Sequence, residues 1–127
     1  MKLFNQSVLA LSALGLATVA MAADPLANTT WQTYDNGEPK ALVKITESGG
    51  VLTGKIISTT RPEGKKFVGR TVMSGLKADG GGKYSGGQIT DPENNKTYRL
   101  TAELKGSDLK LKGHLGPFSR SQTWKKK

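Results

Sequence analysis

The amino-acid sequence predicts an all-β domain, folded as a small antiparallel up-and-down β-barrel of about eight strands. Three observations support this fold class. From Asn28 onward, short stretches in which apolar and polar residues alternate follow one another along the chain. Turns rich in glycine, asparagine and aspartate separate these stretches at intervals of about 8 to 12 residues. No stretch after the N-terminal region has the periodicity of an amphipathic helix.

The first three strands are expected at residues 30–34, 41–47 and 51–58. Asn36 and Gly37 join the first two, because both residue types tolerate the positive φ angles of a tight turn. Residues 48–50, Ser-Gly-Gly, turn the chain into the third strand.

The middle of the chain contains its longest polar connection, residues 59–67. Its proline, glycine and three basic residues predict a mobile loop or a lid over the barrel. A hairpin then follows, with strands at residues 71–77 and 83–90 joined by the glycine-rich turn 79–82.

The clearest alternation lies in the last third of the chain. After an Asp-Pro turn at residues 91–95, stretches 97–104 and 109–115 each place leucines on one face and charged or polar side chains on the other. A final strand is expected at residues 121–125. Closure into a barrel removes both sheet edges and is therefore favoured. A two-sheet β-sandwich remains the alternative, because it would show the same alternation.

Residues 1–22 have the features of a secretory signal peptide. Lys2 supplies the positive charge, residues 8–19 form an apolar run shorter than the ~20 residues of a membrane span, and Ala20-Met21-Ala22 is an A-x-A cleavage site. We expect residues 23–127 to form one exported domain, periplasmic or secreted further, with no transmembrane segment after cleavage. The alternative is an uncleaved N-terminal anchor.

The composition restricts the chemistry. The formal charge is +9, and the absence of cysteine excludes disulfides, a thiol nucleophile and a cysteine zinc site. His114 is the single histidine, so a multi-histidine metal site is excluded too. No G-x-S-x-G nucleophile motif is present. We therefore predict a protein that is not an enzyme and has neither cofactor nor metal.

Four segments, residues 29–45, 49–56, 86–98 and 109–124, occur in the order seen in the bacterial domain of unknown function 2147 family. The most specific are GG-x-I-x-DPEN-x-KTY and the closing R-x-QTW. The chain thus resembles this family over nearly all of residues 23–127. The resemblance implies an exported, lipocalin-like β-barrel without an established activity. It also implies a structural closure of the barrel in which Arg120 stacks on the indole of Trp31.

The leading functional hypothesis is non-enzymatic binding of one small apolar or amphipathic molecule inside the barrel. The ligand-binding residues that we predict are the amphipathic or apolar Tyr84, Tyr98, Leu100 and Trp124, with Arg61, Lys65 and Lys66 steering an anionic head.

A second hypothesis comes from the basic surface. An interaction module with a filled barrel would bind anionic envelope polymer, lipid headgroups or a protein partner through that exterior. A hydrolase acting on envelope material is a third. Export and the regular turn spacing argue against nucleic acid as a partner, and the sequence predicts no particular oligomeric state.

Overall fold

The structure, a computed structural model, describes residues 23–127, so the predicted signal peptide at 1–22 lies outside the described residues. Within residues 23–127, eight strands and one 3-10 helix follow one another. They are β1 (Thr29–Asp35), β2 (Glu38–Ser48), β3 (Val51–Thr59), η2 (Pro62–Phe67), β4 (Thr71–Gly80), β5 (Lys83–Asp91), β6 (Lys96–Lys105), β7 (Asp108–Leu115) and β8 (Phe118–Lys126).

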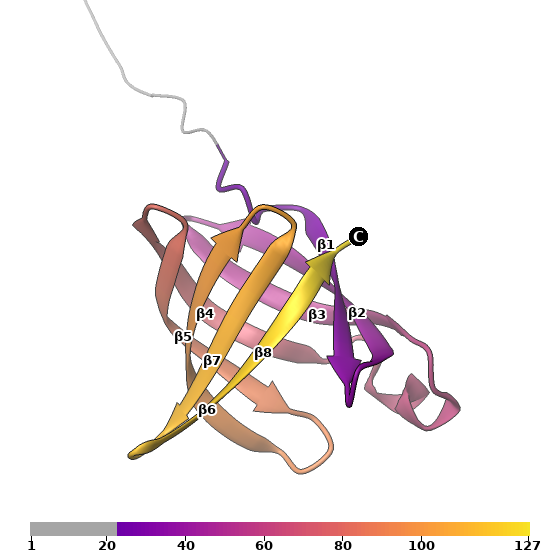
Figure 1. The fold of residues 1–127 in the computed structure, drawn as a ribbon. Helices are drawn as coiled ribbons and strands as arrows, with labels where there is room; N and C mark the ends of the chain where they lie inside the picture. The colour runs from indigo at the N-terminus through magenta and orange to yellow at the C-terminus, as the bar shows by residue number, and fades with distance from the viewer. Residues whose placement is uncertain (1–22) are drawn as a thin grey trace, which may run out of the picture.

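The eight strands form a closed barrel in which each strand pairs antiparallel with the next and β8 pairs with β1 (Figure 1). The prediction of an up-and-down barrel is thereby confirmed. The two-sheet sandwich is wrong, because the pairing continues around the whole ring.

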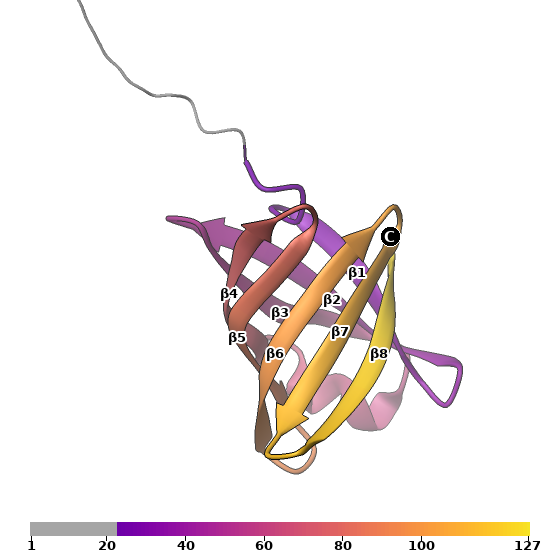
Figure 2. The same cartoon turned by 60° about the vertical axis from the view of Figure 1, so that its left-hand side comes forward.

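The hairpin turns place the connections at two opposite ends of the barrel. In Figure 2, strands β4 to β8 run side by side between these ends. The β2–β3, β4–β5 and β6–β7 turns lie at the end covered by the N-terminal residues, which we call the covered end. The β1–β2, β5–β6 and β7–β8 turns and η2 lie at the other end, the open end.

Several element boundaries differ from the sequence prediction. The β2 strand begins three residues before the predicted start at 41, and β4 ends three residues after the predicted end at 77. The last strand begins at Phe118, three residues before the predicted start at 121. The polar connection contains the 3-10 helix η2, with Pro62 in its first turn and Phe67 packed against the core. Proline fixes the φ angle that the first helical residue needs, so the connection is a docked helical turn where composition alone predicted a mobile loop.

The covered end is closed by apolar side chains. Trp31 of β1 is 1% exposed and Leu26, in the turn before β1, is fully buried in the core cluster. The Trp31 indole N–H donates to Thr29 Oγ1 at 2.7 Å, and this hydroxyl donates to the Leu26 carbonyl at 2.5 Å. The buried polar groups of this end are thus paired, as burial requires.

Asp24 holds the N-terminal turn in place. Its Oδ1 accepts the Leu26 backbone N–H at 2.8 Å and the Tyr84 hydroxyl of β5 at 2.8 Å. Its carbonyl accepts the Ala27 N–H at 2.8 Å. One short acidic side chain therefore ties the first described residues to the wall of the barrel.

Tyr84 makes the covered end sensitive to alkali. Burial, and secondly the hydrogen bond to Asp24, raise the pKa of Tyr84 above its ordinary value of 10. Because the unfolded chain loses this proton first, the stabilisation is complete below about pH 10 and falls above it, by up to about 1.4 kcal/mol per pH unit. Tyr84→Phe should remove this component of alkaline destabilisation. Urea unfolding of both proteins between about pH 8 and 11 measures it, and identical pH slopes would contradict the prediction.

The β1–β8 seam is the shortest pairing in the ring. Register pairs join Trp31 to Lys126 and Gln32 to Lys125, and the Lys127 N–H donates to the Thr30 carbonyl at 2.9 Å. Among residues 23–127, no backbone pairing with β1 is found for the first half of β8. The two strands diverge toward the open end (Figure 1).

Within residues 23–127, no helix has the length and apolar character that a membrane crossing needs.

Candidate functional site

A cavity of about 420 Å³ opens at the open end of the barrel. Its inner wall is apolar because the inward-facing positions of β2, β3, β4, β6 and β7 carry aliphatic side chains, and β8 adds an indole. The apolar lining consists mainly of Val43, Ile56, Val72, Leu100, Leu111 and Trp124. This volume lies in the range of small-molecule sites, about 300–1,000 Å³.

The inner face of β8 changes from apolar to polar along the strand. Trp124, Gln122 and Arg120 alternate with outward residues and all line the cavity. Trp124 donates its indole N–H to Gln122 Oε1 at 2.9 Å. The cavity therefore has an apolar interior and a polar margin on one strand.

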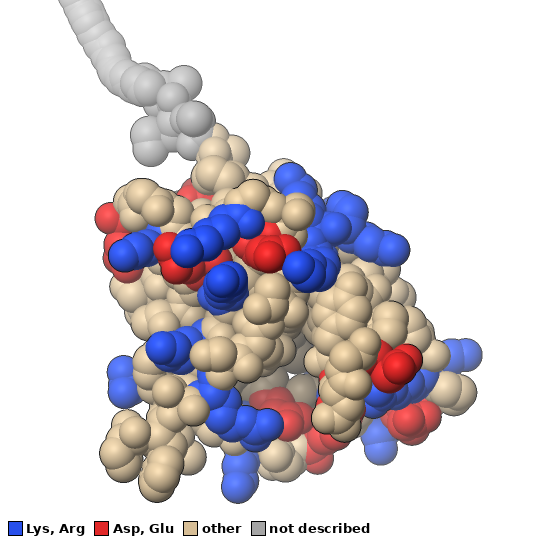
Figure 3. Space-filling view, in the orientation of Figure 1, with Lys and Arg blue, Asp and Glu red and all other residues tan. Residues whose placement is uncertain are grey.

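Figure 3 shows the surface hollowed beside the β1–β2 hairpin, with acidic side chains in and around the hollow. Asp35 and Asp91, at the ends of β1 and β5, line the cavity together with Lys40 of β2. Side chains from three strands, in two hairpins, thus meet at the margin.

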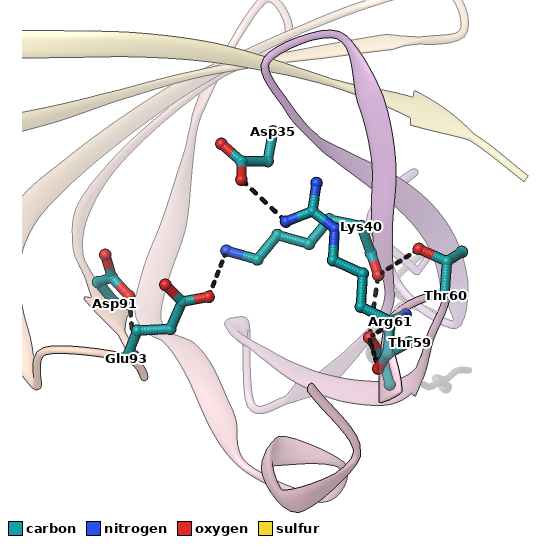
Figure 4. Close-up of polar contacts among 7 residues, drawn as sticks. All are labelled: Asp35, Lys40, Thr59, Thr60, Arg61, Asp91 and Glu93. Carbon is teal, nitrogen blue, oxygen red and sulfur yellow. Dashed lines mark hydrogen bonds and ion pairs between the residues drawn. The ribbon is translucent and has the colours of Figure 1, made fainter. Parts of the chain in front are cut away.

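Two ion pairs neutralise most of the charge there. Arg61 Nη1 lies 2.9 Å from Asp35 Oδ2, and Lys40 Nζ lies 3.0 Å from Glu93 Oε2 (Figure 4). The hydrogen bond from Arg61 holds the pKa of the Asp35 carboxyl below its ordinary value. This pair joins the end of β1 to the chain that follows β3.

The junction between β3 and η2 is fixed by two threonines. Thr59 Oγ1 donates to the Lys40 carbonyl at 3.1 Å and accepts the Arg61 N–H at 3.2 Å (Figure 4). Thr60 Oγ1 donates to the Pro39 carbonyl at 2.7 Å. These contacts position Arg61 toward Asp35. Within residues 23–127 no group of three or more histidine, cysteine, aspartate or glutamate side chains is arranged to hold a metal ion.

The structure brings together three of the predicted ligand-binding residues: Tyr98, Leu100 and Trp124 all line the cavity. Tyr84 does not line it, because its side chain lies at the covered end against Asp24.

The predicted steering cations lie elsewhere. Arg61 is paired with Asp35 and borders a small space of about 40 Å³ under η2. Lys65 and Lys66 belong to η2 and line neither the cavity nor that space. The Lys66 ammonium instead lies 5.3 Å from the centre of the Phe67 ring.

The pairing of Trp31 with Arg120 needs correction. Trp31 lies opposite Lys126 in the barrel register, whereas Arg120 lies opposite Gly113, six residues away along β8. Arg120 lines the cavity near the open end while Trp31 closes the covered end. The register therefore keeps the guanidinium away from the indole, whose N–H is already bound to Thr29.

Sequence reasoning missed Arg120 and Gln122 as cavity residues, together with Asp35, Lys40 and Asp91. A signal for the first two was present, because alternation backward from Trp124 places both on its face. The predicted start of the last strand at residue 121 left Arg120 outside it.

A closed antiparallel eight-stranded barrel with a cavity at one end defines a small lipocalin-like protein. In agreement, the fold is similar to protein HP1028 from the human pathogen Helicobacter pylori, described as belonging to the lipocalin family. The TM-score is 0.64 at 21% sequence identity, and the match covers 79% of this chain and 82% of the other. At this identity the likeness shows the fold alone.

The chain belongs to the DUF2147 family, described as "uncharacterized protein conserved in bacteria", whose model matches residues 29–126. The family resemblance seen in the sequence is thereby confirmed. A comparison with curated proteins found no match.

Proposed function

We propose that this protein is an exported, periplasmic binding protein that holds one small amphipathic molecule in its barrel and is not an enzyme. The observation that carries the proposal is the cavity of about 420 Å³ with an apolar interior and a polar margin. An amphipathic ligand matches both surfaces, because its chain is removed from water inside and its head stays at the margin. The signal-like residues 1–22 support export.

The cavity volume limits the size of the ligand. The volume of about 420 Å³ lies in the lower part of the range of small-molecule sites, about 300–1,000 Å³. A single chain of medium length with a small head has this size.

Decan-1-ol is a neutral test ligand of the right size. Native mass spectrometry of the protein purified from the periplasm shows whether a molecule travels with it, and calorimetry measures decanol binding. We expect one decanol per chain, with the heat capacity decrease of apolar burial.

A bulky side chain in the cavity should block this binding. Val72 lines the cavity and the neighbouring Thr71 is exposed. Val72→Trp should weaken decanol binding about tenfold or more, or about 1.4 kcal/mol, while Thr71→Trp leaves it within about twofold. Thermal unfolding of both variants reports folding, and Leu111→Phe replaces Val72→Trp if that variant does not fold.

The outcome that would overturn the proposal is a wild-type protein that carries no small molecule and binds no decanol. Equal effects of Val72→Trp and Thr71→Trp would also count against it. The basic exterior, acting on an anionic polymer or a partner protein in a salt-sensitive way, would then be the site to test.

A further inference from the structure

Arg120 is a cavity cation that the protein leaves without a carboxylate. Of the basic side chains at the margin, Lys40 pairs with Glu93 and Arg61 pairs with Asp35. Within residues 23–127, Arg120 takes part in no ion pair and its guanidinium makes no hydrogen bond. Its five N–H donors therefore face the cavity and solvent.

Gln122 adds a second donor on the same face of β8. The Trp124 indole can only donate, so the Gln122 oxygen must face it, at 2.9 Å. The Gln122 amide NH₂ is then turned away from Trp124, and it has no acceptor among residues 23–127. Since residues two apart on a strand share a face, Arg120 and Gln122 offer their donors to the same side of the cavity.

We infer that Arg120 and Gln122 bind the anionic head of the ligand, a carboxylate, with its apolar chain on the aliphatic wall beyond them. The guanidinium fork matches the two oxygens of a carboxylate and can bind both. The Gln122 amide contributes a third donor. This inference rests on the proposed function, because it names the head of the molecule that the barrel holds.

Asp91 is the cavity carboxylate without an ion pair among the described residues. Its role is explained locally, because Asp91 Oδ1 accepts the Glu93 N–H at 2.9 Å and shapes the β5–β6 turn. Nothing comparable within the described residues occupies Arg120. The formal charge of +9 further favours the approach of an anion.

Three single-chain ligands with the same tail test the inference by calorimetry: decanoate, decan-1-ol and decylphosphocholine. On the wild type, decanoate should bind about tenfold or more tightly than decanol, as expected for a charge-assisted contact. Arg120→Gln should abolish this preference, because it weakens decanoate binding much more than decanol binding. Arg99, exposed on the outer face of β6, is the matched control, and Arg99→Gln should keep the preference.

Gln122→Glu isolates the second donor, because it keeps an acceptor for Trp124 and replaces the amide donors with a negative charge. Decanoate binding should fall about tenfold, a larger loss than that of decanol binding. Arg120→Lys, which keeps the charge but not the fork, should retain part of the preference.

Each failure has a separate meaning. If neither decanol nor decanoate binds the wild type, the proposed function fails. If both bind equally, or if Arg120→Gln and Arg99→Gln behave alike, the head-group inference fails and the proposed function stands. Tighter binding of decylphosphocholine than of decanoate, with a loss on Asp91→Asn, would overturn the inference in favour of a zwitterionic head.

Discussion

Replacing Trp31 by alanine is expected to lower the free energy of unfolding by about 3–5 kcal/mol. Trp31 is 1% exposed at the covered end, so its removal leaves a cavity that the surrounding strands fill only in part. The change also leaves Thr29 Oγ1 without its indole donor. Because domains of this size are stable by about 5–15 kcal/mol in total, a large share of the stability would be lost.

Urea denaturation of the wild type and Trp31→Ala measures this loss directly. Phe118→Ala is the control for removing an aromatic ring, because Phe118 is 75% exposed, and its effect should stay within about 0.5 kcal/mol. A similar small effect at both positions would show that Trp31 does not hold the covered end together.

Leu26→Ala is expected to cost about 2–5 kcal/mol, although Leu26 lies before the first strand. Its side chain is fully buried in the core cluster, and its backbone is held by Asp24 and Thr29. Removing most of the Leu26 side chain should therefore expose the core at the covered end to water and release the N-terminal turn. Amide hydrogen exchange should quicken at Leu26 and Ala27 beyond the global change.

The same leucine-to-alanine change at Leu115, which is 55% exposed at the end of β7, provides the comparison. We expect Leu115→Ala to change stability by about 0.5 kcal/mol or less. If Leu26→Ala changed stability as little as Leu115→Ala, the N-terminal turn would not contribute to the core of the barrel.

The strands were predictable because alternation with period two is a local signal. The β6 strand shows this well, since Tyr98 and Leu100 face inward while Arg99 faces out. The turn that carries Leu26 was not predictable in the same way. A single leucine among polar residues has no period, and its burial depends on strands far away in the chain.

The candidate site was only partly predictable. Leu100 and Trp124 could be assigned to the interior from their strands, but the same pattern describes a filled barrel and a hollow one. Whether space remains depends on side chains from all eight strands together, which no local pattern encodes. The ion pairs of Arg61 and Lys40 are equally non-local, because each partner lies in a different hairpin.

Arg61 and Arg120 both lie in surroundings that differ from those the sequence predicted. Arg61 was expected to steer an anion but is already bound to Asp35. Arg120 was expected to stack on an indole but lines the cavity without a carboxylate. Residue type alone suits both arginines to either role, so the register of β8 decides between them.

The short β1–β8 seam has a consequence for self-association. The first half of β8 leaves backbone groups unpaired on the side facing β1, and such an edge can template the addition of a strand from another copy, the first step of fibril growth. Residues 118–127 carry four basic residues and no acidic ones. Two such edges would repel each other when brought together, a protection that salt weakens. The net positive charge of residues 118–127 thus opposes the association of two copies at the β1–β8 seam.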